Sequence, residues 1–321
     1  MPVTPAETFD YGPGGLGGNY KQVLVIRPDV PGVFPVLFFV PGKQLFEGGG
    51  FAAKLGQPYL AFLQHVASHG YVGAFVRVEQ GTLDADHMRM ADDLLAATVV
   101  TFDKISVANP NKVAFAGHSM GAKVALLATW RTLNSDFANA WCDPRAVLLF
   151  SVANDPPPIG TYLNALDKVK VMLKEAPTWF TFVSGDDDST APWNDPKKPN
   201  AQALYAALPT EKKQLLVLHG TGADDPNPKT TPELADDHAA PLSIEGKPGG
   251  LVDFAMPNSH LDALDWYGFW KWTVGALDFH FKQGDAKWAY GEQRTLGGNT
   301  AEGKPILHEL VQQGWTGAPI P

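Results

Sequence analysis

The chain has 321 residues, of which 45% are hydrophobic and 18% are charged, and its formal net charge is −9. This length allows one large α/β domain or two small ones with a substantial buried core. The negative charge and the lack of a basic cluster argue against nucleic acid or an anionic membrane as a partner.

Neither cysteine usage nor the N-terminal segment indicates a compartment. The single cysteine, Cys142, cannot form an internal disulfide. The N-terminal segment lacks a basic region followed by an apolar stretch, and no run approaches the ~20 apolar residues that a membrane span needs. For the chain as given we expect a soluble protein without a signal peptide, either cytoplasmic or secreted with its signal removed. No oligomeric state is predicted.

The first third of the chain alternates between strand and helix patterns. Strands are predicted at residues 20–27, 36–40 and 71–78 from runs of apolar and β-branched residues. Helices are predicted at about 58–68 and 84–104, the second with an acidic start and an amphipathic body.

A strand, a tight turn and a helix follow, with Ser119 at the turn. Residues 113–116 form a short apolar run, and residues 122–130 are rich in strong helix formers. Gly117 and Gly121 flank the serine in a Gly-x-Ser-x-Gly pattern, and they remove side chains that would collide in so sharp a turn. This arrangement is typical of a nucleophile elbow, so Ser119 is the predicted nucleophile.

Three further strands are predicted beyond the elbow, at residues 146–151, 178–183 and 214–218. Strands that alternate with helices predict a mostly parallel sheet with helices on both faces, formed by a single α/β domain over residues 1–321. Residues 220–250 are rich in Gly, Pro, Asp and Thr and lack periodicity. We expect this irregular insertion to be either a lid or a surface loop.

A serine hydroxyl becomes a nucleophile when a histidine takes its proton and a carboxylate orients that histidine. In this strand-turn-helix class the chain order is serine, acid, histidine. Asp188 is the first choice for the acid because it lies in a glycine-opened turn after a predicted strand, where open α/β sheets bind ligands. Asp155, at the end of the preceding strand, is the alternative.

The histidine is chosen in the same way. His260 is the first choice because it lies in a loop between the apolar run 251–256 and a predicted helix, and His219, directly after a strand, is the alternative. His238 follows two aspartates, and we interpret it as part of a surface charge cluster rather than a metal ligand. His118 is interpreted as structural. The mechanism needs neither metal nor cofactor, and none is expected.

An oxyanion hole requires two backbone N–H groups aimed at the charge that develops on the substrate. One is expected from Met120, the residue after the nucleophile, and the other from Lys43 in the loop after the early strand, with Gln44 as the next candidate.

Four segments resemble the chlorophyllase-type branch of the α/β-hydrolases: Phe-Phe-Val-Pro-Gly at 38–42, Leu-Gln-His-Val-Ala-Ser-His-Gly-Tyr at 63–71, Ala-Gly-His-Ser-Met-Gly at 116–121 and Ser-His-Leu-Asp-Ala-Leu-Asp at 259–265. Residues 185–192 resemble the acid loop of the cutinase and polyester-hydrolase branch. Together the resemblances cover about residues 34–282. They imply an α/β-hydrolase domain that hydrolyses esters.

The two resemblances imply different partners for the same nucleophile, Ser119. Similarity to chlorophyllases implies Asp155, and the Ser-His-Leu-Asp match implies His260. Similarity to cutinases implies Asp188, with a spacing that suits His219. Because the elbow departs from chlorophyllases after the serine, ester hydrolysis is carried over and chlorophyll as a substrate is not.

The sequence therefore predicts a serine carboxylesterase that forms an acyl-enzyme on a small or polymeric ester. Phe46, Phe51 and Trp193 near the predicted catalytic loops favour an apolar or aromatic substrate. An amidase or peptidase with the same triad, and a non-catalytic binding protein on the same fold, are the alternatives.

Overall fold

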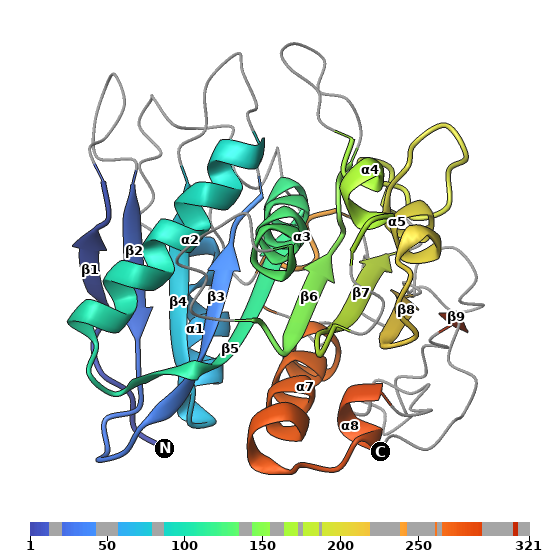
Figure 1. Ribbon diagram of the computed structural model, residues 1–321. Helices are drawn as coiled ribbons and strands as arrows, with labels where there is room; N and C mark the ends of the chain where they lie inside the picture. Colours follow the sequence, from blue (N-terminus) through green and yellow to red (C-terminus); the bar gives the residue numbers. More distant parts are fainter. Residues whose placement is uncertain are drawn as a thin grey trace, which may run out of the picture.

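The computed structural model contains, within the residues it describes, a nine-stranded sheet with the order β1-β2-β4-β3-β5-β6-β7-β8-β9 (Figure 1). The strands are β1 (Glu7–Asp10), β2 (Gln22–Ile26), β3 (Phe34–Val40), β4 (Val72–Arg77), β5 (Ala108–His118), β6 (Ala146–Phe150), β7 (Trp179–Gly185), β8 (Lys213–Leu218) and β9 (Val311–Gln313). The structure describes residues 1–12, 21–42, 57–78, 87–134, 143–154, 164–172, 176–185, 188–218, 238–242, 261, 265–290 and 311–313.

The centre of the sheet is parallel and its edges are antiparallel. Each neighbouring pair from β4 through β3, β5, β6 and β7 to β8 is parallel. The antiparallel pairs are β1 with β2, β2 with β4, and β8 with β9. Because parallel strands all end at one edge of a sheet, the loops after β3, β5, β6, β7 and β8 lie at a common edge, where such sheets place their ligands.

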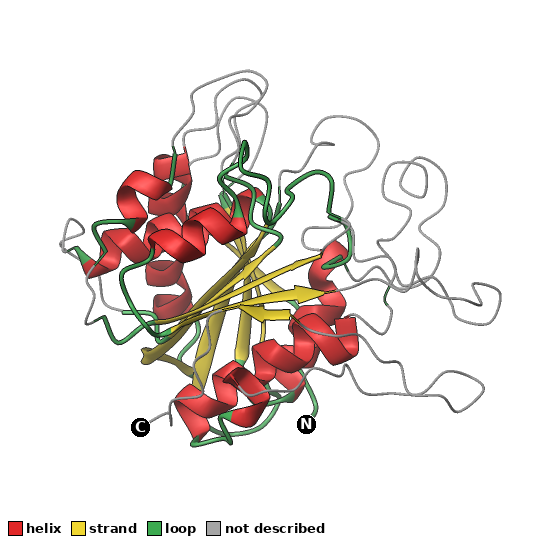
Figure 2. Cartoon of the chain, turned by 90° about the vertical axis from the view of Figure 1, so that its right-hand side faces the viewer, coloured by secondary structure: helices red, strands yellow, loops and turns green. Residues whose placement is uncertain are grey.

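Helices cover both faces of the sheet, as the edge-on view shows (Figure 2). The helices are α1 (Leu60–Ser68), preceded by the 3₁₀ turn η1 (Gln57–Tyr59); α2 (His87–Lys104); α3 (Met120–Leu133); α4 (Leu166–Val169); α5 (Ala201–Ala207); α7 (Trp270–Lys282), preceded by the π-helical turn η2 (Asp265–Phe269); and α8 (Lys287–Tyr290). No described helix is long and apolar enough to cross a membrane.

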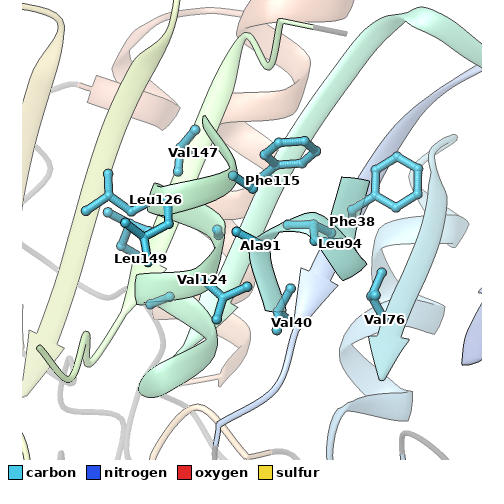
Figure 3. Close-up of a cluster of buried hydrophobic side chains, with 14 of the residues drawn as sticks. Phe38, Val40, Val76, Ala91, Leu94, Phe115, Val124, Leu126, Val147 and Leu149 are labelled. Carbon is cyan, nitrogen blue, oxygen red and sulfur yellow. The ribbon is translucent and has the colours of Figure 1, made fainter. Parts of the chain in front are cut away.

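Two hydrophobic clusters, one on each face, hold the helices to the sheet. Alternate residues of a strand point to opposite faces, so Phe38 and Val40 join one cluster while Leu37 and Phe39 join the other. The first cluster packs the sheet against α2, α3, α4 and α5, and Figure 3 shows its centre. The second packs it against α1, α7 and α8. A sheet buried on both faces explains why its strands are almost continuously apolar.

The α/β fold with a mostly parallel sheet and two helical layers confirms the predicted fold class. One boundary differs: β5 begins at Ala108 rather than near residue 113, because Ala108 pairs with Phe34 across an irregularity in the register. The segment Asn109-Pro110-Asn111, which has a turn-like composition, is thus part of a strand. The predicted insertion 220–250 lies outside the described residues except for 238–242.

Candidate active site

Ser119 stands at the junction of β5 and α3 in a backbone conformation that non-glycine residues rarely adopt. Its φ is 57° and its ψ is −123°. The two flanking glycines make room for this turn. A Cβ on Gly117 would lie 2.3 Å from the carbonyl oxygen of Gly121, and one on Gly121 would lie 2.2 Å from that of Val40. The sequence-based explanation of the elbow therefore agrees with the geometry.

Backbone hydrogen bonds to the neighbouring strand hold the elbow in place. The N–H of Ser119 donates to the carbonyl of Phe150 at 2.9 Å, and the N–H of Ala153 donates to the carbonyl of Ser119 at 3.2 Å. The N–H of Ala122 also donates to the Ser119 carbonyl, at 3.1 Å, as the helix begins. The strained residue is thus fixed by β6 on one side and α3 on the other.

A histidine and an aspartate form a hydrogen-bonded series with the serine. Nε2 of His238 lies 2.8 Å from Oγ of Ser119, and its Nδ1 lies 2.8 Å from Oδ2 of Asp188. An ionised carboxylate accepts and does not donate, so Nδ1 carries the proton toward Asp188. Nε2 then presents its lone pair to the serine hydroxyl. This is the geometry of a nucleophile, a base and an orienting group.

Asp188 is held rigidly in the loop after β7. Its carboxyl group is buried, and Oδ1 accepts hydrogen bonds from the N–H groups of Thr190 at 3.0 Å and Ala191 at 2.7 Å. Burial by itself would raise the pKa of Asp188, but the hydrogen bonds from His238 and from the Ala191 N–H hold it below the ordinary value. The group is therefore an anion at neutral pH with one oxygen directed at the histidine.

The histidine beside Ser119 in the structure is His238, which is not the predicted choice. His260 and the alternative His219 were expected here, but both lie outside the described residues, and the place beside Ser119 Oγ is filled by His238. The prediction followed strand ends, whereas His238 belongs to the irregular segment 220–250. Its charged neighbours made it resemble a surface cluster.

One signal could have pointed to His238. Long segments without regular structure inside a compact domain are often functional, and catalytic groups are disproportionately found on loops. Within residues 220–250 there is a single histidine. Whether this segment is a lid stays a prediction, but its described part, 238–242, contacts the nucleophile.

The oxyanion-hole prediction is only partly within the described residues. Met120 is the first residue of α3, so its N–H lies at a helix N-terminus, where it has no partner in the preceding turn. Lys43 and Asp155 lie outside the described residues. Gly42, just before Lys43, comes close to the nucleophile: a Cβ built on it would lie 3.2 Å from the Cβ of Ser119. The start of the loop after β3, at Gly42, therefore lies beside Ser119.

The described residues form no cluster of three or more His, Cys, Asp or Glu side chains that could hold a metal ion. The side chains that meet at the elbow within that part of the chain are those of Ser119, His238 and Asp188.

Comparison with known proteins shows that part of the chain matches a protein family. The Chlorophyllase family model matches residues 17–143. The match covers β2 to α3, including Ser119, and ends before Asp188 and His238. It confirms the resemblance to chlorophyllases, whose family belongs to the α/β-hydrolases, and it points to a hydrolase of the ester type. A comparison with curated proteins gives no match.

Proposed function

We propose that this protein is a serine carboxylic-ester hydrolase with Ser119 as the nucleophile, His238 as the general base and acid, and Asp188 as the residue that orients the histidine. The observation that carries the proposal is the pair of 2.8 Å hydrogen bonds that join the three side chains. The match to an ester-hydrolase family over residues 17–143 supports the reaction type.

In the first half of the reaction, Oγ of Ser119 attacks the ester carbonyl carbon while its proton moves to Nε2 of His238. The carbonyl π electrons move to oxygen and form a tetrahedral oxyanion. When this species collapses, the C–O bond to the alcohol breaks, and the alcohol leaves with the proton from His238. The products are a free alcohol and an acyl group bound to Ser119.

In the second half, a water molecule gives a proton to Nε2 of His238 and attacks the acyl carbon. A second tetrahedral oxyanion forms and collapses, the bond to Oγ breaks, and the proton on His238 returns to Ser119. The carboxylic acid is released and the enzyme is regenerated. Throughout, the Asp188 anion stabilises the imidazolium that forms at each proton transfer.

Backbone N–H groups are proposed to stabilise both oxyanions. Met120 supplies one donor from the start of α3, where the helix dipole also favours negative charge. Lys43 is proposed as the second donor, because Gly42 brings the loop after β3 beside Ser119. Loss of one such donor typically lowers the rate on the order of a hundredfold or more.

The substrate is proposed to be an apolar or aromatic ester. The buried side chain of Met120 lies next to the nucleophile in the chain, and Trp193 is half-buried in the loop that follows Asp188. A panel of p-nitrophenyl esters with acyl chains of increasing length tests this part. We expect kcat/KM to rise from acetyl to longer or aromatic acyl groups, and a preference for charged acyl groups would contradict it.

Three single variants test the catalytic assignment: Ser119→Ala, His238→Asn and His260→Asn. We expect kcat on a short p-nitrophenyl ester to fall at least about a thousandfold in the first two. His260→Asn is the control and should stay within about threefold of the parent. Hydrolysis retained by Ser119→Ala would contradict the proposed function. Activity lost in His260→Asn but retained in His238→Asn would move the base to His260.

The paired ester and amide of one acyl group separate an esterase from an amidase, because the amide needs protonation of a poorer leaving group. We expect turnover of the ester and little turnover of the amide.

A further inference from the structure

The buried imidazole of His118, the residue immediately before the nucleophile, connects two other segments of the site. Its Nε2 lies 2.8 Å from the backbone carbonyl oxygen of His238, and its Nδ1 lies 2.8 Å from the hydroxyl of Tyr59. The N–H of Gly42 donates to the same hydroxyl at 3.4 Å. His118 and Tyr59 are both 4% exposed. These contacts form one continuous chain from Gly42 to His238.

The direction of each hydrogen bond follows from its partners. A carbonyl oxygen only accepts, so Nε2 of His118 carries the proton and donates to His238. In the neutral ring Nδ1 is then an acceptor, and the Tyr59 hydroxyl donates to it. The Tyr59 oxygen keeps lone pairs with which it accepts the Gly42 N–H. Every donor in this series of hydrogen bonds therefore has an acceptor. By donating to Nδ1, Tyr59 selects the His118 tautomer that can donate from Nε2 to the His238 carbonyl.

The protonation states fit this arrangement. Burial, and secondarily the neighbouring His238, lower the pKa of His118 to about 3, so its ring is neutral at working pH. Burial raises the pKa of the Tyr59 phenol, so its proton is retained. A neutral His118 also places no positive charge beside the imidazolium that His238 forms during proton transfer in the proposed mechanism; the two ring centroids lie 5.0 Å apart.

We propose that Tyr59 and His118 form a positioning pair that fixes the backbone of His238, and that of Gly42, relative to Ser119. The inference rests on the proposed function, because it concerns the same nucleophile and base. His238 lies in the short described turn 238–242, and its carbonyl is held by the residue adjacent to Ser119. This one pair of side chains therefore sets the positions of both His238 and Gly42 relative to the nucleophile elbow.

A positioning role predicts a loss in kcat rather than in substrate binding. A displacement of about 1 Å in a catalytic group can lower a rate on the order of a hundredfold, even when the chemistry of the group is unchanged. Neither Tyr59 nor His118 has a proton to exchange with the substrate in the proposed mechanism. Their removal should therefore leave KM close to that of the parent.

The chain contains a matched control pair on the opposite edge of the sheet. Nε2 of His280 lies 2.7 Å from the hydroxyl of Tyr290, which is also buried. The ring of Tyr290 packs at a tilt against that of Trp179, the first residue of β7, whereas Asp188 follows the last residue of that strand. Substitutions here remove the same kind of hydrogen bond far from Ser119.

The experiment compares His118→Leu, His118→Gln and Tyr59→Phe with the control variants His280→Leu and Tyr290→Phe. We expect kcat to fall tenfold to a hundredfold in His118→Leu and about tenfold in Tyr59→Phe, with KM within twofold. His118→Gln keeps an N–H donor near Nε2, so its kcat should be at least fivefold above that of His118→Leu. The control variants should keep kcat within twofold, although their Tm falls.

Two results would overturn the proposal. One is a kcat for His118→Leu within twofold of the parent. The other is a kcat for His118→Gln no higher than for His118→Leu when both are corrected for the folded fraction. If His118→Leu does not fold, the kcat of Tyr59→Phe is the test. A value within twofold of the parent would then overturn the proposed positioning role.

A readout without substrate separates this inference from the proposed function. The ¹⁵N shifts of His118 in the parent should report a neutral Nε2–H tautomer, and Tyr59→Phe should change them. Unchanged shifts in Tyr59→Phe would overturn the pair whether or not the protein hydrolyses an ester. A failed proposed function instead appears as hydrolysis that survives Ser119→Ala while the His118 signals stay as expected.

Discussion

Oδ2 of Asp188 lies 2.8 Å from Nδ1 of His238, although 50 positions separate the two residues in the chain. Asp188 follows β7, and His238 lies beyond β8. They meet because parallel strands bring their following loops to one edge of the sheet, where the elbow after β5 also lies. The hydrogen bond between Asp188 and His238 therefore depends on the order of the parallel strands. Its contribution to catalysis can be measured with a variant of Asp188.

Asp188→Asn should lower kcat by about a thousandfold to ten-thousandfold with little change in KM. The amide removes the negative charge that stabilises the imidazolium and favours the wrong histidine tautomer. Its side-chain oxygen can still accept the N–H groups of Thr190 and Ala191, so the fold should persist. Steady-state kinetics and thermal unfolding measure the two effects.

Asp195→Asn is the matched control for this variant. Asp195 lies in the same loop and accepts the N–H of Lys197 at 2.8 Å, but among the described residues it makes no hydrogen bond or ion pair with Ser119, His238 or Asp188. It should keep kcat within about twofold. An Asp188→Asn enzyme as active as Asp195→Asn would show that Asp188 does not orient the base.

Gly121→Ala should destabilise the protein by about 2 kcal/mol or more, because backbone atoms cannot easily move away from the added methyl group. The new Cβ would lie 2.2 Å from the carbonyl oxygen of Val40 and 2.3 Å from that of Pro41. Gly12→Ala is the control, since its Cβ would meet only the flexible Lys21 side chain, nearest at 3.0 Å. Urea unfolding of both variants gives the comparison, and equal free energies of unfolding would contradict the packing argument.

The elbow could be predicted from the sequence because its requirements are local. A buried strand, two glycines and a helix lie within a short stretch around Ser119, and each is visible in residue types. Asp188 was predicted for a similar reason, since it lies in a turn that directly follows the strand ending at Gly185. Where a strand ends, the position of the next few residues follows from that strand.

The histidine could not be predicted in this way. The position of His238 depends on the path of a segment that has no periodic pattern, so neither strand nor helix signals fix it. The same limit applies to β9, whose three residues pair with β8 from a distant part of the chain. It also applies to the start of β5, which is set by pairing with Phe34 and not by the Asn-Pro-Asn composition. In each case tertiary contacts override the local sequence.

Asn154→Ala should reduce the free energy of unfolding by about 2–4 kcal/mol, because several buried polar groups lose their partners. Asn154 is fully buried after β6, and its side-chain Nδ2 donates to Asn164 Oδ1 and to the carbonyl of Pro199, both at 2.9 Å. Its Oδ1 accepts the N–H of Ala165 at 2.9 Å. The side chain thus links the segments before α4 and α5.

Asn134→Ala is the corresponding control at the end of α3. Asn134 Nδ2 also donates to a backbone carbonyl, that of Trp130, but the residue is only half-buried. Its removal should change the free energy of unfolding by less than about 1 kcal/mol. Similar losses in the two variants would argue against a buried linking role for Asn154.

Acid should destabilise the fold through His118 between about pH 6.5 and pH 3. The pKa of His118 is lowered to about 3 in the folded protein from an ordinary value of 6.5. As the pH falls below 6.5, the unfolded chain binds a proton that the folded protein does not, so the free energy of unfolding decreases by at most about 1.4 kcal/mol per pH unit. The decrease from this group ends near pH 3, where the folded protein also binds the proton.

His118→Gln removes this titration while keeping a polar side chain in place. Urea unfolding at pH 4, 5 and 6 should therefore give a shallower dependence of the free energy of unfolding on pH for His118→Gln than for the parent. His280, whose pKa burial lowers to about 4, contributes in the same direction and remains in both proteins, so the difference between them isolates His118. Identical slopes would mean that His118 titrates alike in the folded and unfolded states, and the buried neutral ring would have to be abandoned.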